Sequence, residues 1–303
     1  FLPEIFEEYT SDVIKNYLDV SGWQRFNLKK EFDTQRKIQQ YFSDKTDEKS
    51  LKIRDGLYAL CNEVLFVRDR ANHNRFHPRI TAQYSYSYRY LDDNVKSVFN
   101  RLYDDFFYCR HNYYWREQAT KKLPALISST SMLVCGEDLG MVPDCVHSVM
   151  DELQILSLEI QRMPKNSNVS FSDLDALPYF SVATTSTHDM SPIRLWWMEN
   201  KEIIQKYYNE ILHRECEAPD ECSPELCRQI VQKHLDSSAM WVILPWQDWM
   251  SVSGELSREN PAEERINVPA NPEHYWRYRM HISLDDLLKQ GEFNAEIKSM
   301  AER

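Results

Sequence analysis

The stretch of sequence that decides the fold is Met132-Leu-Val-Cys-Gly-Glu-Asp-Leu-Gly140. An apolar run of strand-forming residues stops at Gly136, and two adjacent carboxylates, Glu137 and Asp138, follow before a second glycine. Buried parallel strands have this composition, and α/β enzymes carry their reactive groups at the carboxyl ends of such strands. The stretch therefore predicts a buried strand that brings acidic side chains to one edge of a parallel sheet.

A second strand end with polar chemistry follows further along the chain. Residues 180–187 read Phe-Ser-Val-Ala-Thr-Thr-Ser-Thr, which is typical of a strand, and His188 and Asp189 come directly after them. A glutamate at one strand end and a His-Asp pair at another indicate acid/base or glycoside chemistry at a shared edge.

The composition restricts the class of protein. The chain has 303 residues, 42% of them hydrophobic and 27% charged, which is typical of a globular protein with one large domain or two smaller ones. Its net charge of −11 argues against a surface that binds nucleic acid. It suits a neutral or small substrate.

The absence of targeting signals and the spacing of the cysteines indicate where the protein is located. No segment has the length and apolarity of a membrane span, and no signal peptide is visible, so we expect no membrane partner and a cytoplasmic location. The 7 cysteines are irregularly spaced, which favours free thiols over a zinc site. The chain begins at Phe1 and not at methionine, so we expect it to be part of a longer polypeptide.

Two regions differ in their pattern of secondary structure. Residues 1–130 have mostly helical apolar spacing, with a polar, tyrosine-rich loop expected over 72–90 and a long helix over 92–116. From residue 131 the pattern becomes strand, turn and helix in repetition, which predicts a parallel sheet. The expected strands are 132–136, 156–161, 180–186 and 240–244, and the expected helices are 143–153, 192–200, 202–213, 224–235 and one from Leu284.

Four strands are too few for a closed barrel, which needs eight. The strand-bearing part runs only from residue 132 to about residue 250. The chain therefore contains either a small open sheet or half of a barrel whose other half lies upstream.

Each candidate residue also has a purely structural interpretation. Glu137 could cap the turn that follows its strand. Asp189 could be a helix N-cap, since Met-Ser-Pro192 follows it. His188 could be a satisfied core histidine, or a metal ligand with Asp189, although no third ligand with suitable spacing is present. Asp138 is better explained as a structural hydrogen-bonding partner than as a catalyst.

Two further interpretations remain open from the residues alone. Trp196 and Trp197 are better explained as core residues than as platforms for sugars. Asn267 could simply cap a turn before Pro269.

Several motifs together resemble one family of enzymes. The chain resembles the 4-α-glucanotransferases (amylomaltases) of glycoside hydrolase family 77, and within them the long form typified by the plant cytosolic disproportionating enzyme. The resemblance spans nearly the whole chain. The stretches that carry it are Cys135-Gly-Glu-Asp-Leu-Gly-Met-Val-Pro143, Glu159-Ile-Gln-Arg-Met-Pro164, Ser186-Thr-His-Asp189, Leu195-Trp-Trp197, Ala239-Met-Trp241, Glu264-Arg-Ile-Asn-Val-Pro269 and Asn271-Pro-Glu-His-Tyr-Trp-Arg-Tyr-Arg279.

The resemblance implies a retaining transglycosylase on a (β/α)₈ barrel, without a metal or another cofactor. Glu137 matches the family's general acid/base at the end of the fifth strand, and Asp189 matches the transition-state stabiliser at the end of the seventh. His188 matches the histidine that contacts the sugar at the cleavage site, and Asn267 is expected to contact that sugar too. The implied partners are maltose, maltodextrin or a glycogen-like glucan.

One family residue has no match. The family nucleophile is an aspartate in an Arg-x-Asp motif at the end of the fourth strand, and the nearest strings, Arg54-Asp-Gly56 and Arg68-Asp-Arg70, do not fit it. The resemblance therefore implies an α/β fold that is the carboxyl-terminal part of the barrel, strands five to eight. Residues 1–130 would be the end of a mainly helical insertion, and residues 131–303 would be this half of the barrel.

Two classes of function follow. The first is part of an enzyme, whose parent protein transfers α-1,4-glucan segments by a retaining double displacement, while this chain alone is inactive for lack of the nucleophile. The second is a non-catalytic glucan-binding or structural fragment. A half barrel also leaves two strand edges unpaired, so we expect the missing amino-terminal half as a partner, or self-association.

Overall fold

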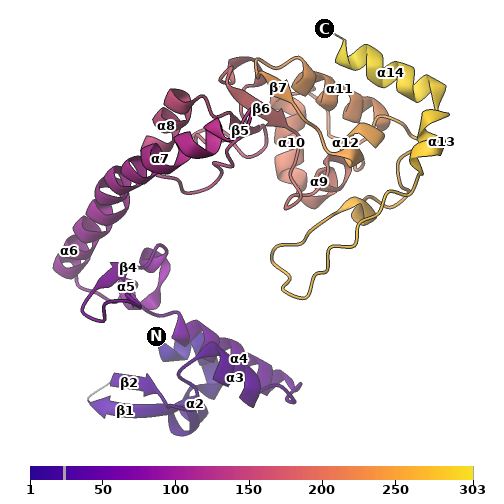
Figure 1. The fold of residues 1–303 in the computed structure, drawn as a ribbon. Helices are drawn as coiled ribbons and strands as arrows, with labels where there is room; N and C mark the ends of the chain where they lie inside the picture. Colours follow the sequence, from indigo (N-terminus) through magenta and orange to yellow (C-terminus); the bar gives the residue numbers. More distant parts are fainter. Residues whose placement is uncertain (23–24, 303) are drawn as a thin grey trace. The chain divides into compact units, whose positions relative to one another are not determined.

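The computed structural model describes residues 1–22 and 25–302. The chain forms two compact units, unit 1 (Phe1–His111) and unit 2 (Asn112–Arg303), which are described separately (Figure 1). In the described residues, no helix is long and apolar enough to cross a membrane.

Unit 1 consists of helices and two short antiparallel hairpins. Phe6, Val13, Ile38 and Leu57 are buried at its centre. Side-chain caps start several of the helices: Thr34, Asp47 and Asp92 each accept a hydrogen bond from a backbone N–H of the first turn that follows. The elements are α1 (Leu2–Phe6), η1 (Glu7–Tyr9), α2 (Thr10–Tyr17), β1 (Leu18–Gly22), β2 (Arg25–Leu28), α3 (Gln35–Tyr41), α4 (Glu48–Cys61), β3 (Phe66–Arg68), β4 (Phe76–Pro78), η2 (Ala82–Tyr84), α5 (Tyr86–Arg89) and α6 (Asp93–Asp104).

Unit 1 departs from the sequence prediction in its irregular segments. The loop expected over 72–90 is wrong in part, because this range contains β4, η2 and α5, and β4 pairs with β3. Glu7 has a positive φ of 48°, and the turn η1 that begins there separates α1 from α2. At Gly56 an added Cβ would lie 2.2 Å from the Phe6 ring, so α1 packs on α4 only because a glycine is there.

The long helix expected after residue 92 is present. It continues from α6 through the π-helical turn η3 (Asp105–Arg110) into α7 (His111–Ser128). The boundary between the two compact units lies inside this run, between His111 and Asn112. The reason is that α7 is attached to the next helix, α8 (Cys145–Leu153), where the Cys145 backbone N–H donates to Asn112 Oδ1 over 3.2 Å and Arg116 pairs with Glu152.

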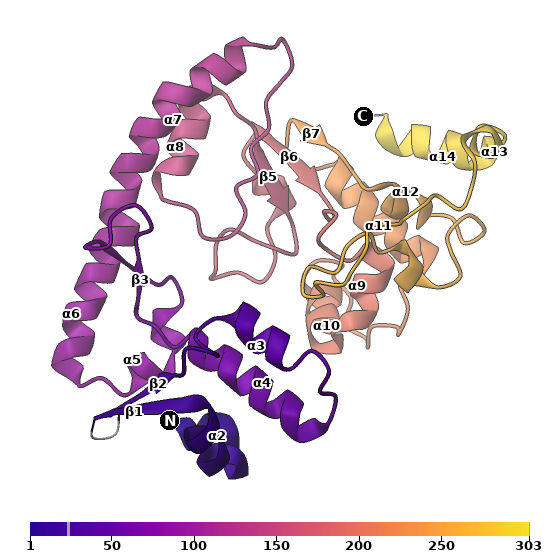
Figure 2. The same ribbon diagram turned by 60° about the horizontal axis from the view of Figure 1, so that its bottom comes forward.

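Unit 2 is built on a parallel sheet, as the sequence predicts. Its strands lie in the order β5 (Ser157–Ile160), β6 (Ser181–Thr184) and β7 (Trp241–Val242), and both pairings are parallel (Figure 2). Cys135 forms a parallel bridge to Leu156, directly before β5. This bridge lies on the side of β5 away from β6, so the segment around Cys135 extends the sheet by one position. The four expected strand segments are therefore neighbours in chain order. The buried strand expected over 132–136 is wrong, because only Cys135 pairs and Met132, Leu133 and Cys135 are exposed on the open edge of the sheet. Each of the other three strands is shorter than the apolar run that predicts it.

Helices cover this sheet and form the main core. Trp197, Tyr207, Ile230, Val231 and Met250 are buried together, which confirms the core interpretation of Trp197. One helix has the bounds that its sequence predicts, 224–235, and Ser223 caps it by accepting from Leu226 N–H. The remaining elements are η4 (Leu174–Ala176), α9 (Ile193–Glu199), α10 (Lys201–Glu210), α11 (Pro224–Leu235), α12 (Trp246–Met250), η5 (Pro261–Glu264), α13 (Leu284–Leu288) and α14 (Gly291–Ala301).

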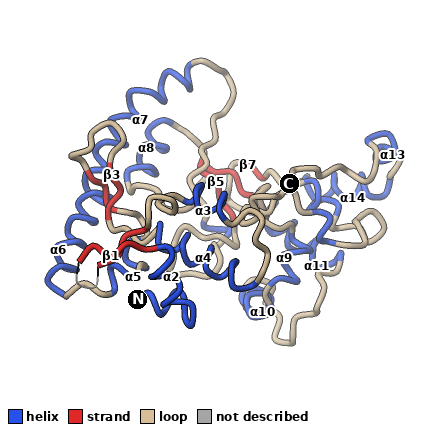
Figure 3. Tube along the Cα trace, turned by 90° about the horizontal axis from the view of Figure 1, so that it is seen from below, coloured by secondary structure: helices blue, strands red, loops and turns tan. Residues whose placement is uncertain are grey.

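A long irregular segment connects α12 to α13. It contains only the 3₁₀ turn η5 and is drawn as loop in Figure 3. It carries the two motif stretches 264–269 and 271–279, and Asn267 in the first of them contacts Asp189, after the end of β6.

Candidate active site

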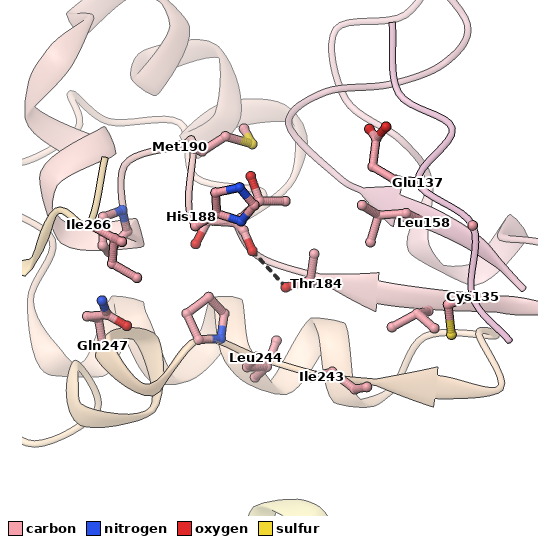
Figure 4. Close-up of a pocket in the computed structure, with 16 residues that line it drawn as sticks. Cys135, Glu137, Leu158, Thr184, His188, Met190, Ile243, Leu244, Gln247 and Ile266 are labelled. Carbon is pink, nitrogen blue, oxygen red and sulfur yellow. Dashed lines mark hydrogen bonds between the residues drawn. The ribbon is translucent and has the colours of Figure 1, made fainter. Parts of the chain in front are cut away.

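A pocket of about 520 Å³ lies at the carboxyl ends of the strands in unit 2. Its apolar wall includes Leu158, Val182 and Ile243, one from each of three neighbouring strand segments. Glu137 and His188 also line it, and Figure 4 shows them on the same side of the strands. The structure therefore brings together two of the site residues that the sequence predicts.

Two glycines shape the turn that carries Glu137. An added Cβ at Gly136 would lie 2.9 Å from Met150 Cε, and Gly140 has a φ of 87°, which favours glycine. The Glu137 side chain is exposed, and its Oε1 accepts from Leu139 N–H over 3.1 Å. The carboxylate thus makes the local turn contact of the structural interpretation and also faces the pocket.

Asp138 points the other way, into the protein. It is 3% exposed, and its carboxylate accepts from Leu158 N–H over 3.0 Å and from Lys165 Nζ over 2.6 Å. Lys165 also lies 2.7 Å from Glu159 Oε1. These contacts confirm that Asp138 is a structural hydrogen-bonding partner.

Asp189 and Asn267 are in direct contact, although they lie far apart in the sequence. Asn267 Nδ2 donates to Asp189 Oδ1 over 2.6 Å, and Asp189 Oδ2 lies 3.3 Å from His188 Nε2. Both side chains of the His-Asp pair are about half exposed. Three of the four predicted site residues therefore form one contact group beside the pocket, and the fourth, Glu137, lines the pocket with His188.

The N-cap interpretation of Asp189 is wrong. Helix α9 begins only at Ile193, and the carboxylate that accepts the Ile193 N–H, over 2.8 Å, belongs to Asp248. Asp248 is fully buried and also accepts from the hydroxyls of Thr185 and Ser186. Burial raises the pKa of Asp248.

Two more residues beside the site were not predicted. Arg162, after β5, is largely buried, which lowers its pKa to about 10, and it donates to the backbone of the segment that carries His188. Trp276 is 54% exposed and its ring centroid lies 5.2 Å from that of His188. Both residues lie within quoted motifs, but only a three-dimensional contact assigns them to the site.

The two Arg-Asp strings lie in unit 1 and outside the parallel sheet. Asp69 belongs to the turn of the β3–β4 hairpin, where His77 Nε2 lies 2.9 Å from its Oδ2 and lowers its pKa to about 2. Asp55 lies within α4. Among the described residues, no three His, Cys, Asp or Glu side chains are grouped as a metal ion would require.

The family model for glycoside hydrolase family 77, described as 4-alpha-glucanotransferase, matches residues 24–285. The chain belongs to this family. It is 36% identical over 304 residues to 4-alpha-glucanotransferase DPE2 of Oryza sativa subsp. japonica. This alignment covers 99% of this chain and 32% of that relative. It is 29% identical over 187 residues to the 4-alpha-glucanotransferase of Chlamydia pneumoniae, covering 61% of this chain and 35% of that protein.

The family members it resembles are much longer than this chain. The chain spans about a third of the length of these curated relatives. A solved structure titled amylomaltase from Streptococcus agalactiae in complex with acarbose is also similar, with 16% identity, a TM-score of 0.46, and coverage of 60% of this chain and 34% of that chain.

Proposed function

We propose that this chain supplies the acid/base side of a 4-α-glucanotransferase active site. The parent protein would transfer α-1,4-glucan segments or glucosyl units from maltose or maltodextrin to a glycogen-like glucan. The observation that carries the proposal is the meeting of Glu137 and His188 in one pocket, with the Asp189–Asn267 pair beside it. Family membership supports the choice of reaction.

Each residue would have a distinct role in a retaining double displacement. Glu137 would protonate the leaving glycosidic oxygen, and a nucleophilic carboxylate on the opposite side of the sugar would form the covalent glycosyl-enzyme intermediate. The acceptor hydroxyl would then return its proton to Glu137. Asp189 would stabilise the positive charge that develops on the sugar ring, while His188 and Asn267 would bind its hydroxyl groups.

The fold supports a division of the site between two parts of one protein. The Cys135 segment and β7 form the two edges of the sheet in the described residues, and Leu133, Trp241 and Ile243 are exposed along them. Strands one to four of a (β/α)₈ barrel would pair with both edges and cover the pocket wall. That missing half would also carry the nucleophile, so this chain alone would be inactive and would tend to associate with itself.

The experiment is glucose release from maltose with glycogen as acceptor. It compares this chain with a longer form of the protein that extends upstream. We expect release only from the longer form and a loss of about 10²–10⁴-fold with Glu137→Gln, since general acid/base catalysis contributes that much. Glu202→Gln, at an exposed glutamate of α10, is the matched control and should keep full activity.

Two results would contradict the proposal. Transfer by this chain alone that Glu137→Gln abolishes would show that the chain is active without the upstream half. No transfer in either form would overturn the enzymatic assignment.

A non-catalytic glucan-binding role is the second candidate. The position of both Arg-Asp strings in unit 1 favours it, because the described sheet then has no nucleophile of the family type. A binding module would retain maltodextrin in a pull-down with this chain and would show no transfer in the longer form.

A further inference from the structure

We propose that Arg162 is a positioning residue for the transfer reaction, acting together with Asp248. This inference rests on the function proposed above. Arg162 holds the backbone of the segment 185–191, which carries His188 and Asp189, and Asp248 holds two hydroxyl side chains at the start of this segment. Neither is a candidate for contact with the substrate.

Arg162 contacts the two ends of this segment. Its Nε donates to the carbonyl oxygen of Thr185 over 3.0 Å, and its Nη2 donates to the carbonyl oxygen of Ser191. The guanidinium also lies 4.9 Å from the ring centroid of Trp196. One rigid group, held against an aromatic ring, therefore sets the distance between the beginning and the end of the segment.

Asp248 holds the same segment from the side of β7. Its carboxylate accepts from Ser186 Oγ over 3.1 Å, from Thr185 Oγ1, and from the Ile193 N–H that starts α9. The segment is thus fixed between a cation that follows β5 and an anion in α12. Arg162 follows β5 and Asp248 follows β7, and β6, which leads into the segment, lies between these two strands in the sheet.

The electrostatics favour a role in positioning over simple packing. Among the residues that the structure describes, no carboxylate lies within 4.0 Å of the Arg162 guanidinium, so its donors serve backbone carbonyls and not an ion pair. Asp248 and Glu199 attract this charge from a greater distance, but burial outweighs them and lowers the pKa of Arg162, so the charge is costly to keep there. An apolar side chain would avoid that cost but would leave the Thr185 and Ser191 carbonyls without these donors.

The reactive side chains depend on this backbone. His188 and Asp189 are about half exposed and have few other supports, namely Asn267 and the Trp276 ring. Rotation of the segment would therefore move His188 relative to Glu137 in the pocket (Figure 4), and Asp189 with it. A misplacement of about 1 Å can cost about 10²-fold in rate.

The test has one arm on this chain and one on the longer form. Hydrogen exchange of the segment 185–191 and thermal unfolding are measured in this chain for Arg162→Met and Arg162→Lys. In the longer form, kcat and KM are measured for the same variants and for Arg162→Ala with added guanidinium ion. Arg228→Met is the matched control, because Arg228 bridges α11 to Glu296 in α14, away from the segment.

We expect faster exchange in the segment 185–191 for Arg162→Met and a kcat about 10²-fold lower with a nearly unchanged KM. Arg162→Lys should recover part of the rate, guanidinium should restore part of it to Arg162→Ala, and Arg228→Met should resemble the wild type in exchange of the segment and in kcat. Unchanged exchange, or faster exchange with wild-type kcat, would overturn the inference. If Arg162→Met does not fold, the activity of Arg162→Lys and the rescue of Arg162→Ala by guanidinium ion test the positioning role instead.

The two arms separate this inference from the proposed function. If the unmodified longer form shows no transfer, the proposed function fails, while hydrogen exchange still reports whether Arg162 holds the segment. If transfer is present but Arg162→Lys and guanidinium restore nothing, positioning by Arg162 fails and the proposed function stands.

Discussion

The acids at the rim of the pocket differ from the acids directly behind it. Glu137 and Asp189 are exposed and each accepts few hydrogen bonds. Asp138 and Asp248 are buried: Asp138 accepts from Leu158 N–H and Lys165 Nζ, and Asp248 accepts from two hydroxyls of the segment that carries Asp189 and from Ile193 N–H. Two adjacent positions in one motif, Glu137 and Asp138, therefore have opposite environments.

The difference follows from the cost of removing a charge from water. A buried carboxylate is tolerated only where donors replace its hydration, so Asp138 and Asp248 become connected to several elements at once. A rim carboxylate stays hydrated and free to react, but it cannot fix its own position. We therefore expect changes at the rim to alter rates alone, and changes behind the rim to alter stability, together with the rate where the buried group holds the segment 185–191.

The largest expected effect is at the rim. Asp189→Asn in the longer form keeps an oxygen that can accept from Asn267 but removes the charge. We expect kcat to fall by about 10²–10³-fold, the range for removal of one electrostatic group of the transition state. The thermal midpoint should stay the same. Asp285→Asn, at an exposed acid of α13, is the control, and a wild-type kcat for Asp189→Asn would place Asp189 outside the reaction.

Behind the rim, Lys165→Met should reduce stability. It would leave Asp138 and Glu159 without their shared cation, and removing one partner from a buried charge group costs about 3 kcal/mol. Urea unfolding of this chain measures the change. Lys201→Met, on an exposed pair with Asp220, should change little. Equal midpoints for the two variants would show that the charge group behind the rim does not stabilise the fold.

His234 should make unit 2 sensitive to acid. It is 2% exposed, its Nδ1 lies 2.8 Å from the Ile230 carbonyl oxygen, and burial lowers its pKa to about 4 from 6.5. Because the unfolded chain binds the proton more tightly, stability is complete above pH 6.5 and falls as the pH drops toward 4, by about 3 kcal/mol.

Comparison of the wild type with His234→Gln measures this effect. Asp248 and Glu264, whose pKa values burial raises, act in the opposite direction and are present in both proteins. The difference in the free energy of unfolding between the two proteins should therefore change between pH 6.5 and pH 4. His281→Gln, at an exposed histidine, should track the wild type, and a pH-independent difference would mean that His234 is not buried in its neutral form.

The smallest expected effect concerns Trp276. Its half-exposed ring beside His188 offers a face on which a sugar can stack, a contact worth about 1 kcal/mol. Trp276→Ala should raise KM for the glucan about 5-fold with a smaller change in kcat. Tyr275→Ala removes the neighbouring exposed aromatic ring and is the control. An equal KM for both variants would indicate that Trp276 does not contact the sugar.

Local patterns in the sequence predicted much of unit 2. Apolar runs located the strand segments, and proline after Ser223 located the start of α11. The glycines around Glu137 marked a turn at a strand end, and the structure shows the close approach at Gly136 and the positive φ at Gly140. The bounds of the strands were predicted less well. A strand ends where the adjacent strand no longer pairs with it, and this residue differs from the end of the apolar run.

The support behind the site could not be predicted in the same way. Arg162 and Asp248 hold a segment that is distant from both in sequence, and nothing local distinguishes them from surface charges. The sequence also allowed Asp189 to cap α9, a role that Asp248 has instead. Such contacts depend on the order of strands in the sheet.

The sequence by itself determined the α/β character of unit 2, the strand ends that bear Glu137 and His188, and the family, because these depend on local spacing and on motifs. Only the tertiary structure decided which acids stay in water and which are buried, and which distant groups hold the segment 185–191. The physical reason is that burial and hydrogen bonding are properties of neighbours in space, and in a parallel sheet those neighbours come from separate strands.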